Sequence, residues 1–222
     1  MKRCLIVVML LVLTSGCAMN RVVVDGQRVL CHGVNEFSFS VKDDSLTYVD
    51  DFFITRFLKE SENKGTQIHK SKLVIYGELQ HTIFERFLML EFDSVNFGKT
   101  QFNDFSFTEN KYLYDIRTIK GVKTPRMVTP IPSDWFDYFQ GLLTGYNIED
   151  QWYMAYGLCR GAGMNGEGGW NLLYIEPVPD DLASAGPDSS NWESPNGYTF
   201  EMEAWVDAFV ERAESSFDLT IH

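Results

Sequence analysis

The N-terminal 17 residues constrain the chain most, because they decide which part of it folds and in which compartment. A basic start, Met1-Lys2-Arg3, is followed by ten apolar residues from Cys4 to Leu13. This run is too short to cross a bilayer, which needs about 20 residues. A basic start followed by a short apolar run is typical of an export signal. We therefore expect residues 1–16 to be a signal peptide and residues 17–222 to fold after export as a single domain.

The residues after the apolar run resemble the lipobox of bacterial lipoproteins. Two small residues, Ser15 and Gly16, precede Cys17, while Thr14 stands where the lipobox commonly has leucine. In lipoproteins the corresponding cysteine is lipidated and becomes the new first residue. The resemblance implies that Cys17 is a lipidation site that tethers the domain to a membrane. The alternative is an ordinary secretory signal that is cut after Ala18.

The same resemblance implies a location in the bacterial cell envelope. Lipoproteins with aspartate directly after the lipidated cysteine are typically held at the inner membrane, whereas this chain has Ala18 there. We therefore expect the lipid to lie in the outer membrane and the domain to face the periplasm. No second apolar run in the sequence approaches the length of a membrane span.

Two cysteines, Cys31 and Cys159, remain once Cys4 has left with the signal and Cys17 has been lipidated. Thiols tend to pair in an oxidising compartment, so we predict a disulfide between them. Closing so long a loop would stabilise the fold by about 4–5 kcal/mol in the chain-entropy model. The alternative is a pair of buried free thiols. The sequence has no Cys-x-x-Cys pattern of the kind that binds metal or cycles between redox states.

Acidic residues and tryptophans are concentrated in the second half of the chain. Residues 18–126 hold 15 basic and 15 acidic residues, whereas residues 127–222 hold 2 basic and 16 acidic residues and all 5 tryptophans. A surface with this charge repels nucleic acid and anionic lipid headgroups and attracts a cationic partner. The alternative is that the acidity serves only solubility.

The hydrophobic pattern predicts an α+β fold, with a mixed or antiparallel sheet and a few packed helices. Residues 18–42 are rich in β-forming residues, with a hairpin signal at Asp25-Gly26. Apolar residues at helical spacing favour a helix over 46–58, although the β-branched and aromatic content there argues for a strand. Residues 120–132, with three prolines, are expected to form a loop. Further strands are predicted at 73–79, 84–92, 102–107, 112–119, 151–160 and 170–178, and a further helix at 133–145.

An amphipathic C-terminal helix is expected from about residue 199 to 215, with an apolar stripe on one side. Acidic residues lie on its other side, and like charges at this spacing repel one another. Before this helix, residues 179–197 form a long Pro/Ser/Asp/Gly-rich stretch that contains Trp192. We predict that these acidic residues and this tryptophan contact a partner, the alternatives being a solvated helix face and a tryptophan folded onto the body. The predicted partner-binding residues are Trp192, Glu203, Asp207, Glu211 and Glu214.

The sequence gives no grounds to predict a catalytic site, a metal site or a cofactor. The four histidines are scattered without ligand spacing, and the chain has neither Gly-x-Ser-x-Gly nor His-Glu-x-x-His. A Gly-x-Gly-x-x-Gly sequence at 161–166 is expected to lie in a hairpin loop, because a dinucleotide-binding motif must open a helix. Carboxylate pairs such as Asp180-Asp181 could serve glycan hydrolysis, but acidic residues are abundant enough for chance pairs.

Three classes of function compete. The first is a binding or inhibitory lipoprotein that captures a basic protein, in the manner of immunity lipoproteins that neutralise antibacterial toxins in the periplasm. The second is a structural or assembly lipoprotein of the envelope. The third is a glycan-binding or hydrolytic envelope protein. We expect a protein that is not an enzyme, with a membrane contact through its lipid and no nucleic-acid partner.

Overall fold

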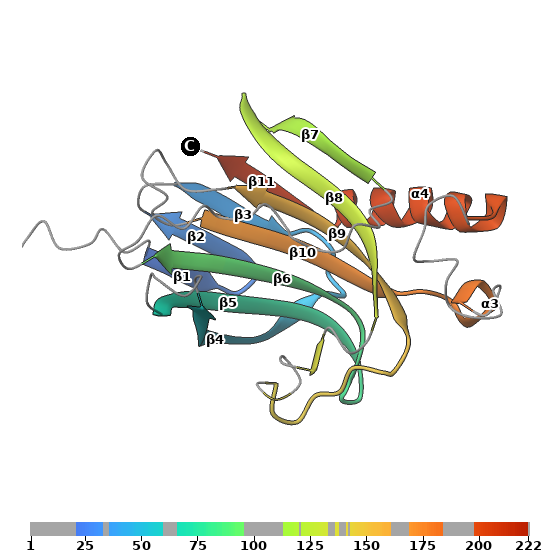
Figure 1. Cartoon of the computed structure of the whole chain (residues 1–222), viewed down its shortest axis with the longest axis horizontal. Helices are drawn as coiled ribbons and strands as arrows, with labels where there is room; N and C mark the ends of the chain where they lie inside the picture. The colour runs from blue at the N-terminus through green and yellow to red at the C-terminus, as the bar shows by residue number, and fades with distance from the viewer. Residues whose placement is uncertain are drawn as a thin grey trace, which may run out of the picture.

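The protein is built mainly from two antiparallel sheets packed face to face (Figure 1). The computed structural model describes residues 21–32, 36–59, 66–95, 113–119, 121–132, 136–137, 141, 143–160, 169–183 and 198–221. Within these ranges two helices have defined bounds, α3 (Asp180–Ala183) and α4 (Phe200–Ser215). Neither described helix is long and apolar enough to cross a membrane.

The larger sheet has seven strands, and its central strands are apolar on both faces. Residues alternate between the two faces of a strand, so a strand without exposed residues must be covered on both sides. The burial of β9 and β10 at nearly every position therefore requires a layer on each face of the sheet. In spatial order the strands are β4 (Thr47–Lys59), β5 (Thr66–Gln80), β6 (Ile83–Val95), β10 (Gly169–Pro177), β9 (Trp152–Arg160), β8 (Val122–Pro132) and β7 (Leu113–Ile119).

The smaller sheet joins the two ends of the described chain. The predicted hairpin at Asp25-Gly26 is confirmed, and Gly26 has a φ of 55°, which a glycine adopts without strain. Side chains of the strand Phe37–Val41 alternate between the two faces of this sheet, and Phe37, Phe39 and Val41 are buried. In spatial order the strands are β1 (Arg21–Asp25), β2 (Arg28–His32), β3 (Phe37–Val41) and β11 (Phe217–Ile221).

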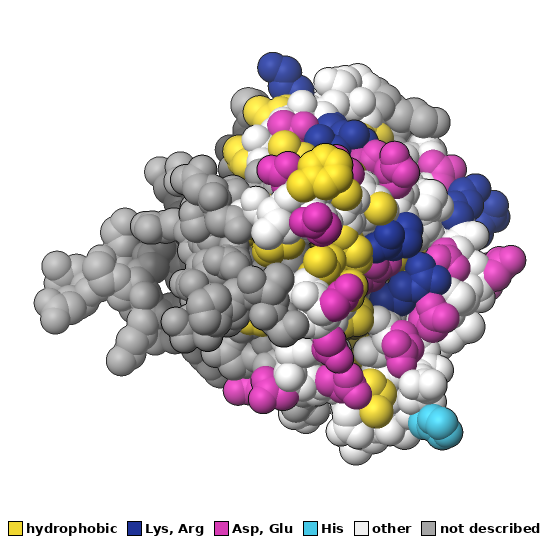
Figure 2. All heavy atoms as spheres, turned by 90° about the vertical axis from the view of Figure 1, so that its right-hand side faces the viewer, with side chains coloured by type: hydrophobic (Ala, Val, Ile, Leu, Met, Phe, Trp, Pro, Cys, Tyr) yellow, Lys and Arg dark blue, Asp and Glu magenta, His cyan; other side chains and the backbone are white. Residues whose placement is uncertain are grey.

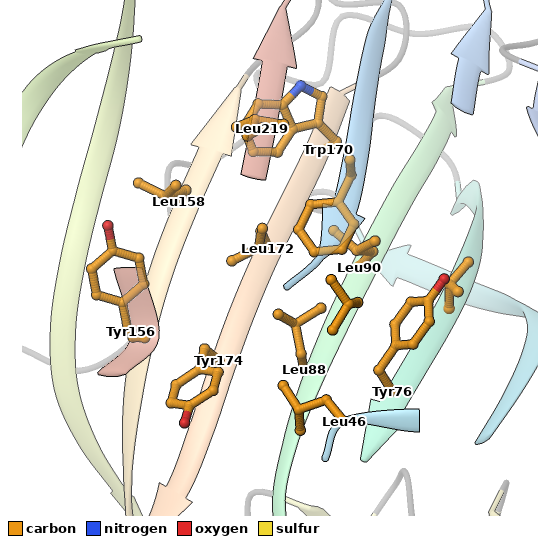
Figure 3. Close-up of a cluster of buried hydrophobic side chains, with 14 of the residues drawn as sticks. Leu46, Tyr76, Leu88, Leu90, Tyr156, Leu158, Trp170, Leu172, Tyr174 and Leu219 are labelled. Atoms are coloured by element: carbon orange, nitrogen blue, oxygen red, sulfur yellow. The ribbon is translucent and has the colours of Figure 1, made fainter. Parts of the chain in front are cut away.

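The main core lies between the two sheets (Figure 3). It also includes the buried apolar residues of α4. Phe37 of the smaller sheet stacks on Phe92 at 5.5 Å and contacts Trp170 at 5.3 Å between ring centroids. The Tyr76 hydroxyl donates a 2.9 Å hydrogen bond to the Gly26 carbonyl, which fixes the β1–β2 hairpin on the larger sheet. The smaller sheet and α4 thus form one cover of the larger sheet.

A second core lies on the opposite face of the larger sheet. Phe136 packs there against Phe87 at 5.4 Å and against Tyr153 at 5.1 Å between ring centroids. Leu143 and Ile148 are buried in the same cluster. Described residues between β8 and β9 therefore contribute to the second cover.

The predicted α+β fold class is wrong, since the chain forms two packed antiparallel sheets with few helical residues. The main cause is the segment 46–58, which is strand β4 rather than a helix. It is an edge strand with a register shift between Tyr48 and Asp50, and it leaves Phe53 exposed. Apolar residues on both faces of an irregular edge strand imitate helical spacing.

The predicted loop at 120–132 is also wrong, because most of it is strand β8. A proline is tolerated in a strand where its nitrogen need not donate to a neighbour. Pro125 pairs only with β7, whereas Pro130 and Pro132 pair only with β9. Each proline therefore lies where β8 has a described neighbour on one side.

Other predicted elements agree with the structure or lie outside its described part. The strands predicted at 73–79, 84–92, 112–119, 151–160 and 170–178 correspond to β5, β6, β7, β9 and β10. The predicted strand at 102–107 falls outside the described residues, and the predicted helix at 133–145 falls largely outside them.

The disulfide predicted between Cys31 and Cys159 is not formed in the structure, where both side chains are buried. Cys31 belongs to the core between the sheets, and Cys159 belongs to the core on the far face of the larger sheet. The backbone of that sheet separates the two side chains, whereas a disulfide needs Cβ atoms about 3.5–4.5 Å apart. Burial, with a smaller contribution from Glu36, raises the pKa of the Cys31 thiol to about 11.

We expect the domain of residues 18–222 to contain two titratable thiols in denaturant and none in the native state. Cys31 and Cys159 supply both, because each is buried in its own core. Titration with a chromogenic thiol reagent measures the number. Cys159→Ser is the control and should leave one reactive thiol in denaturant. If the denatured wild-type protein has no reactive thiol, the two cysteines form a disulfide after all.

Candidate functional site

The exposed face of α4 holds three of the predicted partner-binding residues. The helix begins at a capping box, in which the Thr199 hydroxyl accepts a hydrogen bond from the Met202 backbone. The apolar face, with Met202, Val206, Phe209 and Ala213, is buried against the sheets, as the predicted amphipathic helix requires. The opposite face exposes Glu203, Asp207 and Glu211.

These three carboxylates form a stripe with Phe200, which is 81 % exposed. Residues at i, i+3, i+7 and i+11 lie on one side of a helix, so the aromatic ring stands at the N-terminal end of the stripe. We define Phe200, Glu203, Asp207 and Glu211 as the α4 stripe. None of its three carboxylates forms an ion pair within the described ranges.

Glu214 differs from the other predicted partner-binding residues, because its carboxylate is engaged within the molecule. Its Oε1 lies 2.7 Å from a nitrogen of Arg117 and 2.8 Å from a nitrogen of Arg126. The Tyr156 hydroxyl donates to the same oxygen at 3.3 Å. Arg126 in turn binds Asp115 at 2.6 Å, and the hydrogen bond that it donates lowers the pKa of Asp115. Glu214 therefore joins α4 to strands β7, β8 and β9.

A second polar cluster surrounds Arg86 and connects both layers. Arg86 binds Asp43 at 2.8 Å and Glu78 at 2.5 Å, and it donates to the Tyr174 hydroxyl at 3.1 Å. The Tyr174 hydroxyl donates to Glu176, which pairs with Arg212 of α4 at 2.7 Å. We call these six residues, together with Ser45, the Arg86 cluster.

The protonation states in the Arg86 cluster favour a structural role. Although partial burial opposes the shift, hydrogen bonds from Ser45 and the charge of Arg86 lower the pKa of Asp43. Burial raises the pKa of Tyr174, and the adjacent Glu176 adds to the shift. Asp43 is thus a carboxylate and Tyr174 a neutral donor near pH 7. Each ionised group faces an opposite charge, so the cluster holds its elements together without presenting a free general base.

The remaining sequence-predicted residues lie in α3 or outside the described ranges. Trp192 and Cys17 fall outside them. Asp180 and Asp181 lie in the first turn of α3, where both are exposed. Within the described part of the chain no group of three or more His, Cys, Asp or Glu side chains is arranged to bind a metal ion.

The helices α3 and α4 lie at the right-hand side of the molecule in Figure 1. Figure 2 looks directly at this side and shows acidic side chains spread over it. Basic side chains lie among them, so the charge on this side is mixed. Phe200 is the one member of the α4 stripe that was not predicted. Phe200 directly follows the capping residue Thr199. From the sequence, an apolar residue at this position is readily assigned to the buried face of the helix, so its exposure was not expected.

Comparisons with protein-family models, with curated proteins and with solved structures find no match. The function must therefore be inferred from the residues themselves.

We expect Glu176→Gln to lower the free energy of unfolding by about 1–3 kcal/mol, because it leaves Arg212 and Tyr174 facing a neutral amide in a buried position. Glu203→Gln is the matched control and should change it by no more than about 0.5 kcal/mol. Urea unfolding followed by tryptophan fluorescence measures both. Equal effects of the two changes would contradict a structural role for the Arg86 cluster.

Proposed function

We propose that the mature domain is a lipid-anchored periplasmic protein that captures a basic protein partner through the α4 stripe. One observation supports this most directly. Glu203, Asp207 and Glu211 are exposed and form no ion pair within the described residues, whereas Glu214 of the same helix is paired with Arg117 and Arg126. On α4 the fold thus engages Glu214 and leaves these three carboxylates facing solvent.

The exposed group has the properties of a protein-binding surface. Carboxylates at its rim accelerate encounter with a positively charged surface, while a desolvated aromatic side chain prolongs the complex. Phe200 supplies such an aromatic side chain at one end of the stripe. Trp192 precedes the helix by a few residues and remains a candidate for a second aromatic contact.

An inhibitory function is the specific form of this proposal. A tethered domain that captures a cationic toxin arriving in the periplasm would act as an immunity protein. The alternative, a structural or assembly lipoprotein, predicts a defect of envelope integrity when the gene is deleted. Protection of the cell from a toxin encoded by a neighbouring gene would instead support the inhibitory function.

We expect Cys17→Ser to block processing of the precursor and to abolish labelling with radioactive palmitate. The serine cannot form the thioether that anchors a lipoprotein. Gel electrophoresis and fluorography of labelled cells measure both effects. Cys31→Ser is the matched control and should be processed and labelled normally, while normal processing and release of the Cys17→Ser protein would exclude the anchor.

We expect the double reversal Asp207→Lys/Glu211→Lys to slow association with the captured partner by about tenfold or more and to flatten its salt dependence. The partner is obtained by affinity capture from envelope extract at low and high salt, and surface plasmon resonance measures the rates. Phe200→Ala should instead speed dissociation, because the ring is the apolar contact of the stripe.

Asp25→Lys/Glu85→Lys is the matched control, since it makes the same change of charge at two exposed positions away from α4. It should alter association less than the reversal on the stripe. If the affinity for the partner is unaffected by salt and by the reversal on the stripe, the α4 stripe is not the binding surface. The acidic residues would then serve only solubility.

A further inference from the structure

Strand β7 is an edge of the larger sheet, and one of its faces is exposed and partly apolar. Among the described strands, β7 is hydrogen-bonded only to β8, while β11 of the smaller sheet approaches it without pairing. It is the last strand of the larger sheet (Figure 1). Tyr114 is 47 % exposed and Ile116 is 60 % exposed. Thr118, next on the same face, is also exposed. An exposed edge strand of this kind is a template for pairing with a further strand.

The sequence of β7 is complementary to itself when two copies run antiparallel. In a register centred on Ile116, Asp115 of each copy lies opposite Arg117 of the other, and Tyr114 lies opposite Thr118. Directly opposed residues point to the same face of the sheet and are close enough to interact. The register therefore joins opposite charges on the inner face, and it places an aromatic residue opposite a β-branched one on the outer face.

The ionic contacts already present in one copy are compatible with this register. Asp115 binds Arg126 at 2.6 Å, yet its side chain remains 40 % exposed. Arg117 binds Glu214 at 2.7 Å and remains 41 % exposed. Pairing would extend both ion pairs across the junction, so that no charge covered at the junction is left without a partner.

We infer that two copies of the chain form a two-fold symmetric dimer, with their β7 strands paired antiparallel around Ile116 and their larger sheets joined into one. A two-fold axis places the same residues of both copies in the interface, as this self-complementary register requires. The opposite edge, β4, is less suited to such pairing. Its register shift between Tyr48 and Asp50 interrupts the regular edge.

The test uses the full-length chain in its own envelope with Ile116→Cys. The two introduced thiols face each other across the axis, so a covalent dimer of twice the chain mass is expected on a non-reducing gel. Phe53→Cys is the matched control at a 69 % exposed position of the β4 edge and should give no covalent dimer on this gel. The wild-type chain should also run at the mass of a single chain on this gel, because Cys31 and Cys159 are buried and cannot cross-link its dimer.

A second variant tests the same register without cross-linking. Ile116→Lys places two like charges at the axis and should weaken the dimer by about tenfold or more in sedimentation of the detergent-solubilised protein. Phe53→Lys should leave the dimer intact. The inference is overturned by a monomeric wild-type protein, by equal cross-linking of both cysteine variants, or by an Ile116→Cys adduct of another mass, which would assign β7 to a different protein.

Discussion

The need to cover both faces of strands β9 and β10 determines the rest of the structure. These strands are buried at nearly every position, so the larger sheet cannot be stable with one face in water. One cover is assembled from both ends of the described chain, because β11 pairs with β3 and continues the smaller sheet. The helix α4 extends this cover and places its apolar residues in the same core as β9 and β10.

This arrangement explains why the charge boundary near residue 126 does not separate two structural units. Strand β10 pairs with β6 from the first half of the chain, and β11 pairs with β3. Glu214 from the acidic half is neutralised by Arg117 and Arg126 from the other half. The net charge of the second half therefore describes a set of surface residues rather than an independent acidic domain.

The sequence predicted individual strands better than it predicted the fold class. The apolar runs of β6, β9 and β10 are readily recognised, because residues 87–92 and nearly all of β9 and β10 are buried on both faces of the sheet. Strand β4 was missed because the local pattern does not reveal that the segment lies at an edge. Strand β8 was missed because prolines argue against a strand. They are compatible with one only when it is known on which side each proline has a neighbouring strand. In both cases the decisive information is pairing between segments distant in sequence.

The candidate site shows the same division between local and long-range information. The three carboxylates of the α4 stripe could be predicted, since a helix fixes which residues share a face. The pairing of Glu214 could not, because its arginines lie on strands far away in the sequence. Likewise, two cysteines in a chain with a predicted export signal suggest a disulfide, but only the packing of the two sheets places Cys159 on the face opposite Cys31.

The three carboxylates of the α4 stripe are not equally informative about function. Glu203 lies in the first turn of α4, where a negative charge is stabilised by the helix dipole. Asp207 is in the middle of the helix and Glu211 is close to its C-terminal end, where the dipole disfavours a negative charge. Asp207 repels both neighbours at i−4 and i+4, and each such pair costs roughly 0.2–0.5 kcal/mol in an isolated helix. Helix stability thus accounts for Glu203 but not for Asp207 and Glu211, and contact with a basic partner would offset the repulsion at these two positions.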